Sequence, residues 1–262
     1  MFILTQARTQ GASVAFLDGT PPRVIAHRGL ATHHAENTLG AFGAALEAGA
    51  DILETDVHLS KDGVVIIAHD SDLERVAHRS GLVSEFTAVE LSDMDLGHGE
   101  GFPTLTQALH TFPEARWNID LKIPGVVDPC VHAVMSAGAV DRILVTSFNE
   151  DTRARAVHAL VGVVSSATSR HVMAGRIISW MGLPLSSWKL PGDIVALQIP
   201  PAHAGLALVT PSMIRLAHRK GLEVHVWTIN EVKDMERLWS MGVDAIVTDR
   251  ADLAVEVRRN LP

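Results

Sequence analysis

Seven side chains that could exchange protons, bind metal or hold a phosphate lie inside or at the ends of apolar segments of this 262-residue chain. The segments are RVIAHRG (23–29), DILETDV (51–57), VVIIAHD (64–70) and WNIDLK (117–122). The side chains are His27, Arg28, Glu54, Asp56, His69, Asp120 and Lys122. A charge beside an apolar segment is costly to bury unless it is paired or used. Their positions therefore point to a functional site.

The three carboxylates favour a metal ion. Glu54, Asp56 and Asp120 would repel each other in a partly buried site unless their pKa values rise or a cation holds them ionised. Because Glu54 and Asp56 are two residues apart, their side chains share one face of a regular strand. Oxygen ligands without cysteine indicate a hard ion, so we expect Mg²⁺ or Ca²⁺, with Mn²⁺ less expected.

The basic residues favour an anionic substrate. The guanidinium of Arg28 and the ammonium of Lys122, beside a divalent ion, would neutralise a phosphate ester. His27 and His69, on either side of that anion, could take and give protons near neutral pH. The set as a whole suits phosphodiester cleavage.

Several of these residues have a structural interpretation when taken singly. A histidine at a strand end is most often hydrogen-bonded and structural. Glu54 and Asp56 could be half of a salt-bridge network, and Lys122 could be solvated. What favours the functional interpretation is that all seven are expected at one end of the fold.

Other residues are open to two interpretations. Trp227 fits a pocket wall and a core position equally well. The pair His33–His34 is expected to be solvated near the site, and Asp249 is expected, with the preceding threonine, to cap the last helix. Cys130 begins an amphipathic segment and is expected to be a buried structural thiol.

Eight short segments rich in Val and Ile have the pattern of strands buried on both faces of a parallel sheet. They are RVIA (23–26), DILETDV (51–57), WNIDL (117–121), RILVTS (142–147), VGVVSSA (161–167), DIVALQI (193–199), LEVHVWT (222–228) and DAIVTD (244–249).

Each strand-like segment is followed, directly or after an insertion, by one of helical period, and several of these end in glycine. They are residues 38–49, 104–112, 128–138, 150–160, 171–182, 210–221, 231–242 and 252–260. Eight alternations predict an α/β fold with a single (β/α)8 barrel, a TIM barrel, whose active site lies at the C-terminal ends of the strands.

One segment interrupts the alternation. HLSKDGVVIIAHD (58–70) turns on Asp62-Gly63, which predicts a hairpin after the second strand. If the pairing is centred on that dipeptide, facing residue numbers sum to about 125 and His69 lies opposite Asp56. We expect an insertion at about 58–103, irregular beyond the hairpin.

Composition excludes several other classes of protein. A net charge of −8 and no concentrated run of Lys and Arg argue against a nucleic-acid partner. The single cysteine excludes an internal disulfide framework and is compatible with a cytoplasmic location. The first residues lack a basic region and an apolar stretch of signal or span length, so we expect no membrane insertion. We expect an N-terminal arm at 1–20 and one barrel domain at 21–262.

The residues HRGLATHHAENTLGAFGAALEAGADILETDVHLSKDGVVIIAHD (27–70) resemble the signature of the glycerophosphodiester phosphodiesterases, with the HRG, ENT, DV, DG and HD elements in order. Later segments, NIDLK (118–122) and GVDAIVTDR (242–250) among them, extend the resemblance over about 23–251. It implies a TIM barrel that hydrolyses glycerophosphodiesters to glycerol 3-phosphate and an alcohol with a divalent metal. By the same resemblance, the roles fall to His27 and His69 as acid and base, Arg28 and Lys122 as phosphate contacts, and Glu54, Asp56 and Asp120 as metal ligands.

Two departures from the family pattern bear on function. Asp120 stands where the family usually has Glu, and Ala35 stands where it usually has Pro before Glu-Asn-Thr. Because the Asp120 side chain is shorter than that of Glu, a non-catalytic, metabolite-binding barrel remains an alternative function. A second alternative keeps the site but takes lysophospholipids, which requires an apolar groove; residues 171–190 could supply one or could pack on the barrel as a helix.

Overall fold

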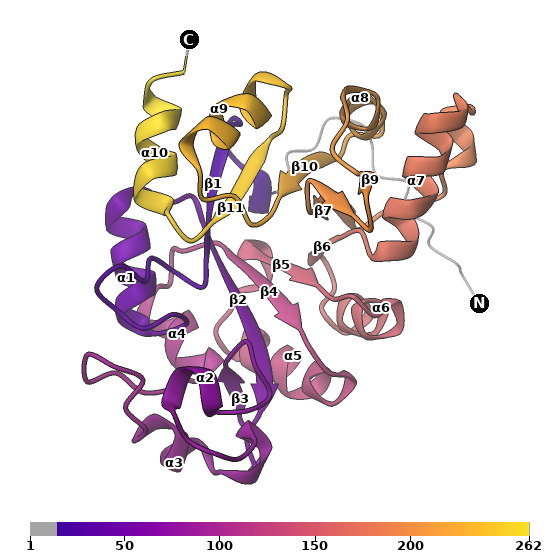
Figure 1. Ribbon diagram of the computed structural model, residues 1–262. Helices are drawn as coiled ribbons and strands as arrows, with labels where there is room; N and C mark the ends of the chain where they lie inside the picture. The colour runs from indigo at the N-terminus through magenta and orange to yellow at the C-terminus, as the bar shows by residue number, and fades with distance from the viewer. Residues whose placement is uncertain (1–14, 262) are drawn as a thin grey trace, which may run out of the picture.

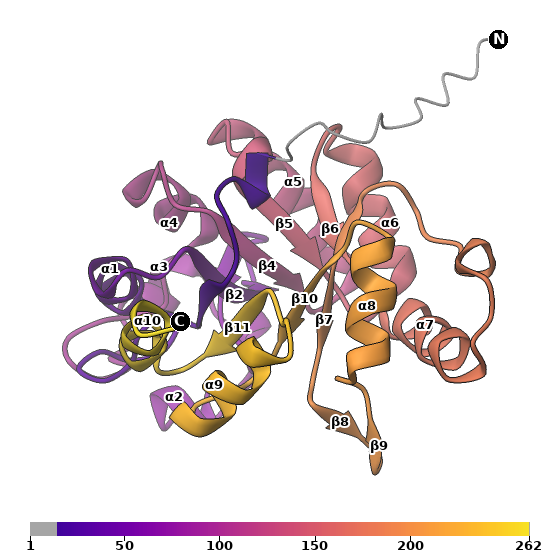
Figure 2. The ribbon, with the colours of Figure 1, turned by 90° about the horizontal axis from the view of Figure 1, so that it is seen from above.

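All eight predicted strands are present in the computed structural model, which describes residues 15–261. They are all parallel and pair in a ring that closes between β1 and β2, which confirms the predicted TIM barrel (Figures 1 and 2). In ring order the strands are β1 (Arg23–His27), β2 (Ile52–Leu59), β4 (Trp117–Leu121), β5 (Ile143–Thr146), β6 (Val164–Ser166), β7 (Ile194–Ile199), β10 (Glu223–Val226) and β11 (Ala245–Thr248).

The helices predicted to follow the strands are also present and cover the outside of the ring. They are α1 (Leu39–Ala48), α4 (Leu105–Thr111), α5 (Val127–Ser136), α6 (Glu150–Ala159), α7 (Ser169–Met181), α8 (Pro211–Arg219), α9 (Val232–Ser240) and α10 (Ala251–Arg259). Four single 3-10 turns lie in the connections, at Val83–Glu85, Pro124–Val126, Val140–Arg142 and Leu185–Ser187. Among the described residues, no helix is long and apolar enough to cross a bilayer.

Alternation along the strands separates two buried layers. In β1, Val24 and Ala26 pack outward against the helices, whereas Ile25 packs inside the ring. In β2, Ile52 points inward and Leu53 outward. The inside is therefore apolar at the N-terminal ends of the strands, and the same inward-facing positions carry polar residues further along.

The N-terminal end of the ring is closed by residues from the expected arm. A 3-10 turn at Ala15–Leu17 buries Phe16 against the inward-facing layer. Arg23 holds this segment by donating hydrogen bonds to the carbonyls of Leu17 and Gly19, and it pairs with Glu223 at 3.0 Å. Residues 1–14 of the expected arm lie outside the described residues.

The predicted hairpin is present, but its predicted register is wrong by one residue. The strand β3 (Val65–Ile67) pairs antiparallel with β2, and Val57 faces Ile67, so residue numbers sum to 124. The register places Ala68 rather than His69 opposite Asp56, because the turn has three residues and ends on Gly63 in the left-handed region, at φ 78°.

The rest of the insertion is less irregular than the sequence suggested. It contains two short helices, α2 (Glu74–Ala77) and α3 (Ala88–Ser92), around a small apolar cluster of its own that includes Leu73, Leu91 and Phe102. A second small hairpin, β8 (Ala202–His203) with β9 (Leu206–Ala207), follows β7 and was not predicted. Both insertions lie at the C-terminal end of the barrel.

Candidate active site

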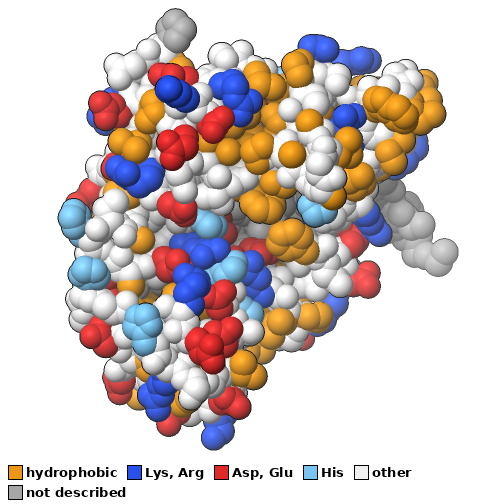
Figure 3. Space-filling view, in the orientation of Figure 1, with side chains coloured by type: hydrophobic (Ala, Val, Ile, Leu, Met, Phe, Trp, Pro, Cys, Tyr) orange, Lys and Arg blue, Asp and Glu red, His pale blue; other side chains and the backbone are white. Residues whose placement is uncertain are grey.

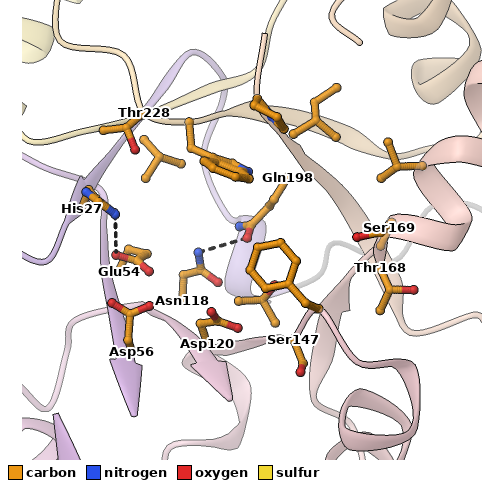
Figure 4. Close-up of a pocket in the computed structure, with 18 of the residues that line it drawn as sticks. His27, Glu54, Asp56, Asn118, Asp120, Ser147, Thr168, Ser169, Gln198 and Thr228 are labelled. Atoms are coloured by element: carbon orange, nitrogen blue, oxygen red, sulfur yellow. Dashed lines mark hydrogen bonds and ion pairs between the residues drawn. The ribbon is translucent and has the colours of Figure 1, made fainter. Parts of the chain in front are cut away.

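All seven predicted site residues line one cavity of about 440 Å³ at the C-terminal end of the barrel. Strand register explains how they meet: His27 pairs with Glu54 between β1 and β2, and Asp56 pairs with Asp120 between β2 and β4. These positions continue the inward-facing set that begins with Ile52, so the side chains enter the ring. Figure 4 shows His27, Glu54, Asp56 and Asp120 turned toward the same space.

His27 is held from behind by a residue of the last strand–helix connection. Its Nδ1 lies 2.6 Å from Oδ1 of Asp249, and its Nε2 lies 4.0 Å from Oε2 of Glu54. Asn230 fixes Asp249 twice, because its Nδ2 donates to Oδ2 at 2.7 Å and its Oδ1 accepts from the Asp249 amide at 2.9 Å. Burial raises the pKa of Asp249, but hydrogen bonds from His27 and Asn230 outweigh it and lower the pKa overall. Asp249 is therefore an ionised partner for the imidazole.

His69 has a similar arrangement. Its Nδ1 lies 2.7 Å from Oδ1 of Asp70, and the other oxygen of Asp70 accepts from Arg75 Nε at 2.6 Å. Arg75, on α2, also binds Glu36, which accepts from Arg28 at 3.0 Å. An ion-pair chain thus links the second histidine to Arg28. It leaves His69 Nε2 as the nitrogen that can exchange a proton with a substrate.

Two of the three carboxylates hold Lys122. Its Nζ lies 2.7 Å from one oxygen of Asp56 and 2.7 Å from one oxygen of Asp120. The other oxygens, Asp56 Oδ2 and Asp120 Oδ1, are buried without a hydrogen-bond partner. Burial, then repulsion by Asp56 and Asp120, raises the pKa of Glu54. Burial also raises the pKa of Asp120, and the positive charge of Lys122 offsets only part of that rise.

These carboxylates are therefore costly to keep ionised without further positive charge. In the described part of the chain, as the side chains stand, no three acidic, histidine or cysteine groups converge closely enough to enclose an ion.

The residues after β1 explain the HRG and ENT elements. Arg28 has a left-handed backbone, at φ 57°, and its amide donates to the Glu54 carbonyl at 3.1 Å. Gly29 follows at φ 86°, where a Cβ would lie 2.6 Å from the Ala41 carbonyl carbon. Asn37 accepts from Thr55 Oγ1 at 2.8 Å, and Thr38 caps α1 by accepting from the Ala41 amide. The loop thus aims Arg28 into the cavity.

The cavity has a charged half and an apolar half. The charged half comes from β1, β2 and β4, and the apolar half lies across from it. The apolar residues include Phe148, Val172, Met173, Ile199, Leu208 and Trp227. Phe148 and Trp227 meet edge to face, with ring centroids 6.4 Å apart, so Trp227 is a pocket wall. In Figure 3 the hollow separates charged side chains from hydrophobic ones.

Sequence reasoning missed the residues that position the histidines. Asp249 was expected to cap a helix, yet Thr248 is the residue that accepts from the Arg250 amide, and Asp249 turns to His27. Arg75 gave no signal, because one of its two partners, Glu36, lies 39 residues away along the chain. His34 pairs with Glu100 at 3.1 Å and does not line the cavity. Cys130 is buried as expected, and burial raises the pKa of its thiol to about 12.

Comparison with known proteins gives consistent matches over nearly the whole chain. Residues 27–253 match the glycerophosphoryl diester phosphodiesterase family. The chain is 35% identical over 251 residues to a probable glycerophosphodiester phosphodiesterase 2 of Mycobacterium tuberculosis, covering 94% of each chain. A solved glycerophosphodiester phosphodiesterase from Agrobacterium tumefaciens is similar with a TM-score of 0.74 and 25% identity, over 91% of this chain and 99% of that one.

A second solved structure shares the fold. It is an Oleispira antarctica phosphodiesterase in complex with the product sn-glycerol-3-phosphate, at a TM-score of 0.75 and 22% identity, over 92% of this chain and 98% of that one. The stretch matched by the family contains all seven predicted site residues.

Proposed function

This chain belongs to the glycerophosphoryl diester phosphodiesterase family, and from that premise we propose how it hydrolyses a glycerophosphodiester to glycerol 3-phosphate and an alcohol. His27 and His69 are the acid–base pair, Arg28 and Lys122 hold the phosphate, and three carboxylates, Glu54, Asp56 and Asp120, would hold a divalent ion. The observation that carries this proposal is that all seven residues line one cavity, with both histidines held at Nδ1 by aspartates.

Proton transfer is assigned to the two imidazoles. One histidine takes a proton from the attacking oxygen, which bonds to phosphorus, and the other gives a proton to the alcohol oxygen whose bond to phosphorus breaks. An aspartate on each Nδ1 fixes the ring and leaves Nε2 as the working nitrogen. The attacking oxygen belongs either to the glycerol 2-hydroxyl, through a cyclic phosphate, or to water. Rapid-quench samples that contain the cyclic phosphate support the first route, and its absence favours water.

The carboxylates have the donor chemistry that a divalent ion needs. Lys122 pairs with one oxygen each of Asp56 and Asp120, and the two oxygens that remain are buried without a hydrogen bond, with Arg28 Nε 3.4 Å from that of Asp56. All the donors are oxygens, which suits Mg²⁺ or Ca²⁺. When bound, the ion would supply the positive charge that keeps Glu54 and its neighbours ionised and would draw charge from the phosphate.

The two basic residues are already fixed by carboxylates before a substrate arrives. Arg28 is held by Glu36 at 3.0 Å and faces Asp56 at 3.4 Å, while Lys122 sits between its two aspartates. Burial lowers the pKa of Lys122, but the negative charges of Asp56 and Asp120 stabilise its ammonium, outweigh burial and raise the pKa overall. Both side chains are therefore charged and oriented, which favours an anionic group in the cavity.

The activity is tested by phosphorus NMR of reactions with glycerophosphocholine and glycerophosphoethanolamine, each with Mg²⁺, Ca²⁺, Mn²⁺ or chelator. We expect the glycerol 3-phosphate resonance to grow with at least one ion and not with chelator. Isothermal titration of the same ions should show binding to the wild type that weakens in Asp120→Asn. Binding of ion or phosphodiester without turnover contradicts the proposal and supports the non-catalytic barrel.

A lysophospholipid is the second candidate substrate, because half of the cavity wall is apolar. Phe148, Met173 and Trp227 would contact a hydrocarbon chain, whereas a small headgroup alcohol does not need them. The ratio of kcat/KM for lysophosphatidylcholine over glycerophosphocholine separates the two. A ratio above one that falls in Met173→Asn supports the lysophospholipid, and an unchanged low ratio excludes it.

The compartment is proposed to be the cytoplasm. Cys130 is the chain's single cysteine and is buried, so the fold uses no disulfide and gains nothing from an oxidising environment. Fractionation of the source cells with an antibody against the native protein checks this location.

A further inference from the structure

The helix α7 is apolar on two faces, and only one of them is packed. Val172, Gly175 and Ile178 are buried against the barrel, with the ring of Trp188 seated on Gly175. The other face exposes Ile177 at 49% and Trp180 at 77%. A surface helix needs only one apolar stripe to pack on a barrel, and contiguous apolar side chains left exposed mark an interaction site. The exposed face therefore calls for a partner.

The exposed face joins its neighbours into one surface, which we call the α7 surface. Its members are Met173, Ile177, Trp180, Met181, Leu183 and Leu206. Arg176 ties α7 to the β8–β9 hairpin by donating to the Ala207 carbonyl at 2.9 Å. Met173 belongs to this surface and also lines the catalytic cavity, so the two are continuous. Hydrophobic side chains gather over α7 at the upper right of Figure 3.

Charge along the chain is strongly uneven around this surface. Residues 152–222 contain eight Lys and Arg and a single acidic residue, Asp193, in a chain with 22 basic and 30 acidic residues. Three of the eight are paired with carboxylates: Arg153 with Asp193 and Glu150, Arg155 with Asp128, and Arg170 with Glu150. The other five are Arg176, Lys189, Arg215, Arg219 and Lys220. The basic residues near the surface include Arg176 on α7, the exposed Lys189, and Arg219 on the neighbouring α8. The apolar surface is thus set in positively charged surroundings on an acidic protein.

We propose that the α7 surface docks on an anionic lipid bilayer, with the mouth of the catalytic cavity at the bilayer. An exposed tryptophan among Ile, Leu and Met side chains, flanked by basic residues, has the chemistry of an interfacial helix. If a second copy of the chain docked through the same face, the basic residues of the two copies would lie close together, and their repulsion disfavours such a dimer. In a bilayer, the lipid phosphates would pair with the basic residues, and the hydrocarbon beneath the phosphates would accept the apolar side chains.

Docking is measured by sedimentation with phosphatidylcholine vesicles made with and without phosphatidylglycerol. We expect the wild type to bind the vesicles that contain phosphatidylglycerol at least about tenfold more tightly, and to release them as salt rises. Ile177→Ser with Trp180→Ser should lower the partition constant roughly tenfold or more. His69→Ala, which disables the proposed chemistry, should bind as the wild type does, so docking and catalysis are judged separately.

The matched control is Val89→Ser with Met135→Ser, which removes two apolar side chains of 69% and 61% exposure on α3 and α5. We expect this variant to bind vesicles like the wild type. Equal binding by both double variants, or no preference for phosphatidylglycerol, overturns the proposal. Light scattering that shows a dimer in the wild type and a monomer in the Ile177 and Trp180 variant also overturns it, because a second copy is then the partner.

Discussion

The contact between Asp249 and His27 gives a prediction that separates the two possible roles of this histidine. Asp249 receives the Nδ1 proton of His27 on one oxygen and the Asn230 amide on the other. In Asp249→Asn the new side chain must still accept from Asn230 Nδ2, so its oxygen faces Asn230 and its NH₂ faces His27 Nδ1. A neutral imidazole then carries its proton on Nε2 instead of a lone pair.

The magnitude follows from the geometry. A hydrogen bond to a charged group contributes about 1.5–3 kcal/mol. The Asp249 side chain is 50% exposed, so the lower end applies, and Asp249→Ala should lower kcat/KM about tenfold. If His27 is the base, Asp249→Asn should cost more, roughly 10²–10³-fold, because Nε2 is blocked by its own proton. If His27 is the acid, the two variants should lose similar amounts.

The assay is steady-state release of glycerol 3-phosphate from glycerophosphocholine by the wild type and both variants. Asp252→Asn is the matched control. Asp252 lies three residues after Asp249, pairs with Arg250 at 2.7 Å and does not line the cavity. Retention of wild-type kcat/KM within about twofold by both Asp249 variants would refute the positioning role.

Two further predictions concern stability. Burial raises the pKa of Glu223, but hydrogen bonds from His225 and Arg23 outweigh burial and lower the pKa from 4.5 to about 2. The ionised Glu223 side chain therefore contributes fully to the free energy of unfolding above pH 4.5, and this contribution is lost as the pH falls toward 2. In urea unfolding, the free energy of unfolding of the wild type minus that of Glu223→Gln should therefore fall by about 2 kcal/mol between about pH 5.5 and pH 3. A difference that stays constant with pH contradicts this linkage. Gly29→Ala should destabilise by about 2–4 kcal/mol, because it adds a backbone clash to a left-handed residue. Gly63→Ala, also left-handed but with open space around it, should cost only about 1–2 kcal/mol, and equal thermal shifts in the two variants would rule out the clash with Ala41.

The barrel could be predicted because its strands are buried on both faces, which leaves an unmistakable apolar pattern. The site could be predicted because Glu54, Asp56 and Asp120 break that pattern at inward-facing positions near the strand ends. No local pattern marks Asp249, whose partner lies at the other end of the chain, so helix capping was the nearest explanation.

The remaining differences have equally local causes. The hairpin register depended on whether Gly63 ends a two-residue or a three-residue turn, and the Asp-Gly dipeptide fits both. For residues 171–190, the sequence offered a groove or a packed helix. The structure contains a helix that packs with one face and exposes the other, because apolar residues occupy both.

The proposed role of His27 and His69, which lie in one cavity with three carboxylates, is to carry out the hydrolysis. It is tested most directly by kcat/KM for glycerol 3-phosphate release with saturating divalent ion, for wild type, His27→Ala and His69→Ala, each shown to be folded by thermal unfolding. Each variant should lose at least about 10²-fold in kcat/KM, the usual contribution of a positioned acid or base. Folded variants that turn over within tenfold of the wild type would contradict it.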